Sequence, residues 1–446
     1  MEYVVMVGQL MLSLSILIVL HEMGHFLPAR WFKTRVEKFY LFFDPGFALF
    51  KKKVGETEYG IGWLPLGGYV KISGMVDESF DTEQLKEEPQ PWEFRSKPAW
   101  QRLIIMLGGV TVNFLLGFLL YGMYLWIWGE EYLPAENVTY GIYADSLGMD
   151  MGLKDGDKIL AIGDKPFEKF SDREVIREVV INGAKNIEVE RDGQKVSLPV
   201  DEKFVDILSR SKNKDKALFG PRFPFFVKEV ADDLPAAKAG MKPGDQVISL
   251  AGQPTDGYYH AFQRLAFKNK GRTVDMGVLR GGDTLNMSIA LTEDGKIGVQ
   301  AQPITDFYKT RTMTYSFAQA LPAGFAEGWG FLGDQLKAFK KMFQGKIKAS
   351  ESLGGFATIG SLFGTEWEWS HFWRMTAILS LILAFMNLLP IPALDGGHVM
   401  FLLYEVITGR KLSDKFMETA TMVGFIIVIG LVLYANGLDF FRWFNK

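Results

Sequence analysis

The stretch His21-Glu22-Met23-Gly24-His25 follows directly on an uncharged apolar run from Val4 to Leu20. On a helix, residues i and i+4 share one face, so His21 and His25 can coordinate one zinc ion between them. Glu22 lies one position along, close enough to take a proton from a metal-bound water. Ionisable residues inside a membrane-length segment are costly and mark functional sites. The stretch therefore predicts a hydrolytic zinc site within a membrane-spanning helix.

The composition combines charge-free apolar blocks with segments of ordinary soluble composition. The 446 residues are enough for two or three domains, and 48% of them are apolar. A net charge of -3 with no concentrated basic face predicts no nucleic-acid partner. The chain has no cysteine, which excludes disulfides, thiolate nucleophiles and cysteine metal sites.

Four apolar blocks are long enough to cross roughly 30 Å of hydrocarbon, which takes about 20 helical residues. They run from Val4 to about Trp31, Leu103 to Trp128, Met375 to Leu394, and Ala420 to Leu438. The first block has no basic leader, so we expect it to remain as a span rather than be cleaved as a signal. The expected fold class is a polytopic α-helical membrane protein with four transmembrane helices and both termini on one side.

Basic residues concentrate in the loops after the first and third blocks. Cytoplasmic loops carry an excess of Lys and Arg, so we expect these two loops in the cytoplasm and the termini and residues 129–370 outside. The residues concerned are Arg30, Lys33, Arg35, Lys38, Lys51, Lys52, Lys53, Lys97, Arg102, Arg410, Lys411 and Lys415.

An internal repeat lies in the long segment between the second and third blocks. Gly152–Leu160 reappears as Gly240–Ile248, with a glycine-rich turn leading into an alternating apolar strand in both copies. The pattern resembles the core of a bacterial PDZ domain, present twice. Such domains bind peptide chain ends at a sheet edge. The plain alternative is a duplicated β-rich spacer without a ligand.

A further periodic stretch follows the second repeat copy. Its apolar residues recur at three- and four-residue steps, which predicts an amphipathic helix, and its place before a membrane span favours the membrane surface. The apolar positions are Phe317, Leu321, Phe325, Trp329, Leu332, Leu336, Phe339 and Phe343.

A second motif lies in the third block, from Asn387 to His398, and places two prolines and two glycines around Asp395. Each proline removes an N–H and breaks helix pairing, so the stretch is expected to be locally unwound. Non-helical backbone at that depth is tolerated only inside protein or beside a wet cavity.

A lone aspartate at the bilayer centre costs about 2.5–3.5 kcal/mol, and sharing a dication removes much of that cost. Two histidines and one carboxylate would leave a fourth zinc position for water, as in catalytic sites. Residue chemistry alone leaves Asp395 and His398 as alternative third ligands.

The two motifs in their two spans resemble the site-2 protease family of intramembrane zinc metalloproteases. The tandem PDZ insertion is similar to that of the bacterial regulator-of-sigma-E protease type. The resemblance implies that His21, His25 and Asp395 hold one Zn²⁺ ion, which selects Asp395 over His398. It further implies that Glu22 is the general base and acid and that Asn387 binds the substrate backbone.

Two other stretches resemble the family more loosely. Gly62–Lys71 looks like its membrane re-entrant β-hairpin, which implies substrate contacts at Gly67, Gly68 and Tyr69; a plain apolar hairpin is the alternative. Gly109 to Asn113 resembles a Gly-x-x-x-Asn element that packs beside the catalytic helix, and ordinary small-residue packing is the alternative. Val110 and Pro28 depart from the family pattern, and Pro28 is expected to kink the first helix just past the site.

The expected boundaries follow from these motifs and spans. They are 1–33 for the first transmembrane helix, 34–96 for a cytoplasmic loop with a re-entrant β-hairpin at about 58–75, 97–128 for the second helix, 129–222 and 223–303 for the two PDZ domains, 304–369 for an amphipathic membrane-surface helix and linker, 370–398 for the third helix, 399–416 for a cytoplasmic loop, 417–438 for the fourth helix and 439–446 for a tail.

The resemblance implies a zinc metalloendopeptidase of the bacterial inner membrane, with its active site towards the cytoplasm and its PDZ domains in the periplasm. The implied partners are single-span membrane proteins of the anti-sigma factor type, signal peptide remnants, peptide chain ends at the PDZ domains and the lipid bilayer. Two other functions remain as alternatives: a metal-dependent transporter, which predicts two similar membrane halves, and an inactive PDZ scaffold, which would not need Glu22.

Overall fold

The computed structural model describes residues 2–65, 67–75, 88–210, 213 and 216–444. It divides into two compact units. The membrane unit comprises Met1–Gly129, Thr314–Leu336 and Leu353–Lys446, and the repeat unit comprises Glu130–Met313 and Lys337–Ser352.

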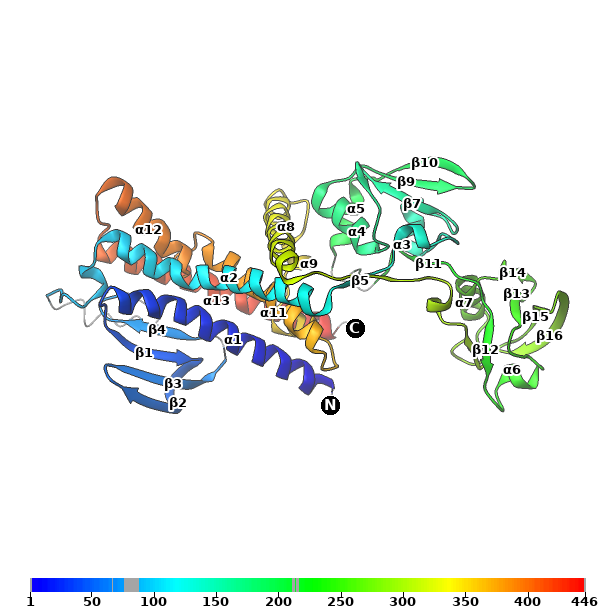
Figure 1. Cartoon of the computed structure of the whole chain (residues 1–446), viewed down its shortest axis with the longest axis horizontal. Coiled ribbons are helices and arrows are strands. Elements are labelled where there is room, and N and C mark those ends of the chain that lie inside the picture. Colours follow the sequence, from blue (N-terminus) through cyan, green and yellow to red (C-terminus); the bar gives the residue numbers. More distant parts are fainter. Residues whose placement is uncertain (1, 66, 76–87, 211–212, 214–215, 445–446) are drawn as a thin grey trace. The chain divides into compact units, whose positions relative to one another are not determined.

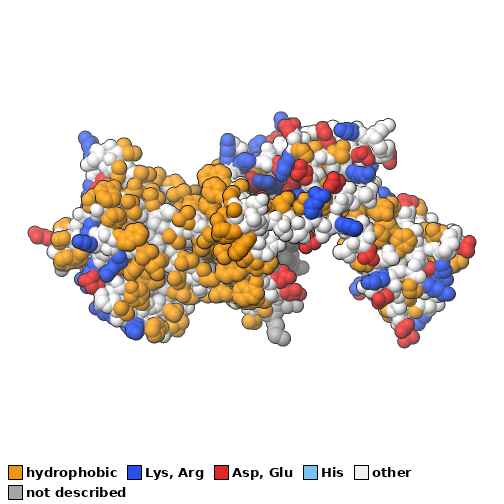
Figure 2. Space-filling model, viewed as in Figure 1, with side chains coloured by type: hydrophobic (Ala, Val, Ile, Leu, Met, Phe, Trp, Pro, Cys, Tyr) orange, Lys and Arg blue, Asp and Glu red, His pale blue; other side chains and the backbone are white. Residues whose placement is uncertain are grey.

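Among the described residues of the membrane unit, four helices are long and apolar enough to cross a bilayer, which confirms the predicted four spans (Figure 1). They are α1 (Glu2–Trp31), α2 (Ala99–Trp128), α11 (Trp369–Leu388) and α13 (Asp414–Phe444). Helix α2 packs against both α1 and α11. Apolar side chains cover the broad surface of this unit, as a lipid-facing surface requires (Figure 2).

The third predicted helix ends earlier than expected. Helix α11 stops at Leu388, residues 389–394 are not helical, and a separate helix α12 (Asp395–Thr408) follows. Pro390 and Pro392 explain the break, since neither can donate to a helical ladder. The expectation of a loop over 399–416 is therefore wrong as far as Thr408, and Asp395 opens a helix, where its charge favours the N-terminus.

A four-stranded sheet follows α1. Its strands are β1 (Val36–Leu41), β2 (Phe43–Val54), β3 (Thr57–Leu64) and β4 (Tyr69–Ile72), in the order β2-β3-β1-β4. The expected hairpin over 58–75 is wrong, because β3 and β4 do not pair with each other. Strand β3 runs parallel to β1, and β4 pairs antiparallel with the other side of β1 as an edge strand. Leu66, within the predicted motif, lies outside the described residues.

The repeat unit contains two sheets with the same strand order. In the first copy the order is β10-β9-β7-β8, and in the second it is β16-β15-β13-β14. The strands are β7 (Lys158–Ile162), β8 (Lys165–Pro166), β9 (Asn186–Arg191), β10 (Gln194–Pro199), β13 (Gln246–Leu250), β14 (Gln253–Pro254), β15 (Thr273–Arg280) and β16 (Asp283–Ala290). Shorter paired strands are β5 (Glu130–Tyr132) with β18 (Arg311–Met313), β6 (Ile142–Ala144) with β11 (Phe219–Pro221), and β12 (Val227–Val230) with β17 (Val299–Ala301). The helices are α3 (Ser146–Asp150), α4 (Asp172–Arg177), α5 (Lys203–Ser209), α6 (Pro235–Lys238), α7 (Tyr259–Lys268) and α9 (Ala349–Ser352).

One buried ion pair recurs at the same place in both copies. Asp157 accepts two hydrogen bonds of 2.8 Å from Arg191, and Asp245 accepts bonds of 2.6 and 2.7 Å from Arg280. Both aspartates are fully buried. Burial alone would raise the pKa of Asp245, but hydrogen bonds from Arg280 and a backbone N–H outweigh it and hold that pKa below its usual range. The repeat in the sequence is thus a repeat in structure.

Helix α8 (Phe317–Phe343) is continuous, as its periodicity predicts. Within the membrane unit it approaches α2 closely, because Gly324 lies against Gly122 and Gly328 against Phe118. Within the repeat unit, Lys341 near its end donates to the carbonyl of Val180. A short helix α10 (Phe356–Ser361) precedes α11.

Candidate metal centre

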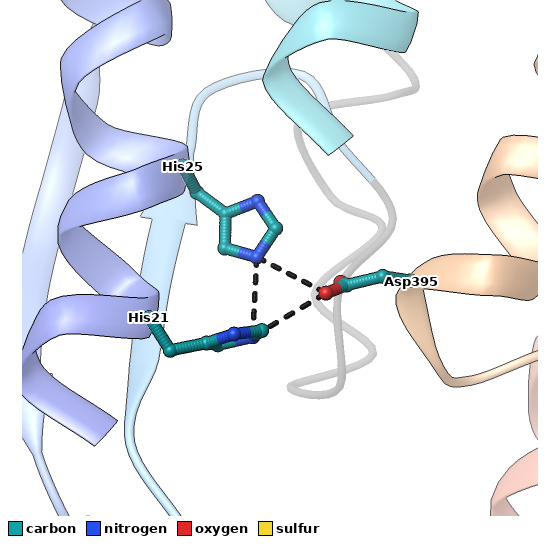
Figure 3. A group of neighbouring side chains, drawn as sticks. All are labelled: His21, His25 and Asp395. Atoms are coloured by element: carbon teal, nitrogen blue, oxygen red, sulfur yellow. Dashed lines mark hydrogen bonds and ion pairs between the residues drawn. The ribbon is translucent and has the colours of Figure 1, made fainter. Parts of the chain in front are cut away.

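Three predicted ligands from two helices converge on one point (Figure 3). Helix α1 presents His21 and His25 one turn apart, and the first residue of α12 presents Asp395. The Nε2 atoms of the two histidines each lie 3.3 Å from Asp395 Oδ2 and 3.4 Å from each other. This triangle of donor atoms is only slightly exposed to solvent.

The triangle fits a zinc ion. Zinc bonds of about 2.0–2.1 Å in a tetrahedron place neighbouring donor atoms about 3.3–3.4 Å apart. Asp395 Oδ2 is buried and, apart from the two histidine nitrogens 3.3 Å away, has no polar partner among the described residues, as suits an atom that binds a metal. His398, the alternative ligand, lies buried on α12 and does not belong to this group of donors.

Neighbouring groups of α2 orient both imidazoles. His25 Nδ1 lies 2.9 Å from the carbonyl of Ile105, so its N–H donates there and Nε2 keeps its lone pair for a metal. His21 Nδ1 lies 3.1 Å from the side-chain amide of Asn113, whose Oδ1 has no partner among the described residues. Exchanging Nδ2 and Oδ1 of the amide, so that Oδ1 accepts from His21 Nδ1–H, gives these two atoms a partner and leaves His21 Nε2 unprotonated as a ligand.

Glycines let α2 approach the histidines closely. A methyl group at Gly109 would lie 2.7 Å from His21 Cε1 and closer still to His25 Nε2. Gly108 lies against the carbonyl of Gly24, and Gly24 in turn against the backbone of Gly109. Pro28 has no N–H to bond to the Gly24 carbonyl, so this oxygen is left for the neighbouring helix. Helix α1 nevertheless continues through Pro28 to Trp31.

Glu22 lies beside the chain segment that leads into strand β4. It is 9% exposed, and a methyl group at Gly68 would lie 3.4 Å from its Cγ. Tyr69 stacks on Tyr40 at 5.3 Å and donates a 2.8 Å hydrogen bond to Asp44, which fixes the start of β4. Strand β4, the outer strand of the sheet, therefore begins beside the Glu22 side chain.

Asn387 lies on the last turn of α11, with Nδ2 3.4 Å from His21 Nε2. Gly67 lies farther off, against the ring of Phe43. The structure thus groups most of the predicted site residues around one point.

Two neighbours of the site were not predicted from the sequence. Ile105 contributes only a backbone carbonyl, and Gly424 of α13 lies against the carbonyl of Pro392 in the unwound stretch.

Comparisons with known proteins agree with this geometry. A family model described as peptidase family M50 matches residues 9–431. A protein of Treponema pallidum (strain Nichols), whose name includes the words zinc metalloprotease, is 29% identical over 456 residues, covering 96% of this chain and 97% of its own. Regulator of sigma-E protease RseP of Escherichia coli (strain K12) is 27% identical over 456 residues, with the same two coverages. Protease RseP of Yersinia pestis is 26% identical over 465 residues, covering 96% and 97%. The chain therefore belongs to peptidase family M50, the site-2 proteases, and is a membrane-embedded zinc metalloprotease.

Proposed function

We propose that this protease cleaves the membrane-spanning segments of single-span proteins, of the anti-sigma factor type, and remnant signal peptides. The observation that carries the proposal is the donor triangle of His21, His25 and Asp395, two helical turns from the end of a membrane-length helix and beside Glu22. A bilayer-embedded site gives such an enzyme access to peptide bonds that soluble proteases do not reach. The names of the two relatives that include RseP support the substrate class.

In this proposal the chain's own residues divide the work. His21, His25 and Asp395 would hold the zinc ion, which would supply a nucleophilic water and polarise the scissile carbonyl. Glu22 would take a proton from the attacking water and pass it to the leaving amine. A substrate helix must unwind first, because its amides are protected by internal hydrogen bonds. Strand β4, the outer strand of its sheet, lies beside Glu22 and offers the unwound segment a strand to pair with, and the amide of Asn387 can bind the substrate backbone.

The repeat unit would control access. We assign its two copies as PDZ domains in the periplasm that bind chain ends, admitting substrates whose outer domain has been trimmed, with the site towards the cytoplasmic side of the inner membrane. Deleting residues 129–303 is expected to let untrimmed substrates be cleaved while hydrolysis continues. Continued exclusion of untrimmed substrates would refute the gate.

The test of the proposed chemistry is Glu22→Gln on a single-span substrate in detergent. Loss of the base at nearly constant shape should lower cleavage by at least about 100-fold, since general base catalysis contributes about 10²–10⁴. Bound zinc should be unchanged. Glu366→Gln, an exposed acid of the same unit, is the matched control. Cleavage by Glu22→Gln at the wild-type rate would end the proposal.

A further inference from the structure

A basic pocket lies at the end of α1, where the candidate membrane span ends. It is about 460 Å³ in volume and is lined by Arg30, Lys33, Thr34, Arg35, Glu56 and Trp92. The pocket lining thus contains three positively charged side chains and one carboxylate, that of Glu56. Arg30 and Glu56 lie 3.5 Å apart, and both side chains are about half exposed, so this pair is weak and leaves a net positive pocket.

Backbone hydrogen bonds hold one wall of the pocket, residues 33–35, in place. Helix α1 ends at Trp31, Lys33 adopts a positive φ of 55°, and Thr34 N–H returns to the carbonyl of Ala29. The backbone of Arg35 is then fixed at both ends, since its N–H donates to Trp92 and its carbonyl accepts from Ser73. The charges at 33 and 35 therefore sit on a rigid corner between helix and sheet.

Two polar atoms of this wall have no partner among the described residues. They are Thr34 Oγ1 and Arg35 Nε, and both are buried. Buried donors are almost always satisfied, so each orphan in a native structure calls for a ligand, an ion or water. An anion with several acceptor oxygens matches a guanidinium, an ammonium and a hydroxyl on one wall.

The surroundings place the pocket at headgroup depth. The candidate span of α1 ends at Trp31, next to Arg30, which lines the pocket. Trp31, Trp92 and Trp100 are 71%, 45% and 52% exposed, and exposed tryptophans gather at membrane interfaces. Charged side chains begin at this end of the unit, where the apolar surface stops (Figure 2). Basic pockets at such positions suit phospholipid headgroups.

We propose that this pocket binds the phosphate group of an anionic phospholipid. Arg35 and Lys33 contact the phosphate oxygens, Thr34 donates its hydroxyl, and Trp92 lies along the glycerol. The bound lipid anchors the end of α1, six residues beyond His25. This proposal concerns lipid binding alone and holds or fails independently of the peptide chemistry.

The test counts bound lipid on the full-length protein by native mass spectrometry in detergent. Phosphatidylglycerol should bind more tightly than phosphatidylcholine. Each cation near a membrane surface contributes about fivefold, so Lys33→Gln with Arg35→Gln should weaken phosphatidylglycerol binding roughly thirtyfold. Lys52→Gln with Lys53→Gln removes the same charge from the exposed strand β2 and should leave the affinity nearly unchanged. Equal losses in the two double variants would overturn the site.

Thr34→Val is a second test, in which the side chain keeps its shape and loses only its hydroxyl. Removing a hydroxyl that donates to phosphate should weaken phosphatidylglycerol binding several-fold and leave bound zinc unchanged. Unchanged lipid binding in this variant would contradict the proposed contact. Competition with glycerol 3-phosphate distinguishes a lipid phosphate from a soluble phosphate as the ligand. Glycerol 3-phosphate should not displace the lipid at equal concentration, and displacement would show that the site takes a soluble phosphate instead.

Discussion

Replacing Gly109 by alanine should disable the metal centre without disturbing the helix that carries it. The added methyl would lie 2.7 Å from His21 Cε1 and closer still to His25 Nε2. Because carbon atoms pack about 3.5–4.0 Å apart, both imidazoles would have to retreat by roughly 1 Å. A zinc bond is only about 2.0–2.1 Å long, so such a retreat breaks the donor triangle.

The expected loss is large. Altering a group that merely orients a ligand costs about 10–100-fold in metal affinity, and Gly109→Ala moves the ligands themselves. We therefore expect at least a hundredfold weaker zinc binding, about 2.7 kcal/mol. The assay is competition with a calibrated chelator on the purified full-length protein, with circular dichroism to show that the helices are intact.

A matched control lies on the same helix. A methyl at Gly117 would lie 2.7 Å from Leu381 Cδ2 and Cγ and 3.2 Å from the carbonyl of Ala377, so its strain falls on α11 and on none of the three metal ligands. Gly117→Ala should therefore keep wild-type zinc affinity. Wild-type affinity in Gly109→Ala, or equal losses in both variants, would refute the view that Gly109 makes room for the ligands.

Three further predictions concern the ligands and the repeats. Asp395→Ala should abolish stoichiometric zinc and His398→Ala should not; metal analysis giving the opposite pattern would reverse the ligand assignment. Asn113→Asp keeps an acceptor for His21 Nδ1–H and should keep zinc affinity, whereas Asn113→Leu should lower it about 10–100-fold, and equal affinities would exclude the orienting role. Asp245→Asn should destabilise the second repeat by about 3 kcal/mol, seen as faster hydrogen exchange there. Folding lowers the pKa of Asp245, so the contribution of its carboxylate to folding stability is complete above the unfolded pKa of about 3.9 and is lost as the pH falls below that value. Acid should therefore remove this stability from the wild type and not from Asp245→Asn.

The sequence anticipated features that depend on local spacing. The histidines at i and i+4 had to share a face, and two prolines around Asp395 had to interrupt the third span. The paired aspartates Asp157 and Asp245 lie in the repeat that the sequence shows directly. Each of these rests on residues close together in the chain.

Other features depend on tertiary contacts that leave no local signature. Strand β3 pairs in parallel with β1 across a crossover connection, and β4 pairs with β1 rather than with β3, so the predicted hairpin joins β4 to the wrong strand. The Ile105 carbonyl orients His25 through backbone alone, and any side chain would serve at that position. The start of α12 at Asp395 depends on Gly396 and Gly397 packing against the unwound chain.

The most direct test of the central claim is zinc K-edge X-ray absorption on the purified wild-type protein. The account predicts one zinc per chain, with two imidazoles and oxygen donors in a single shell at about 2.0–2.1 Å. Absence of stoichiometric zinc, or a shell containing fewer than two imidazoles, would contradict it.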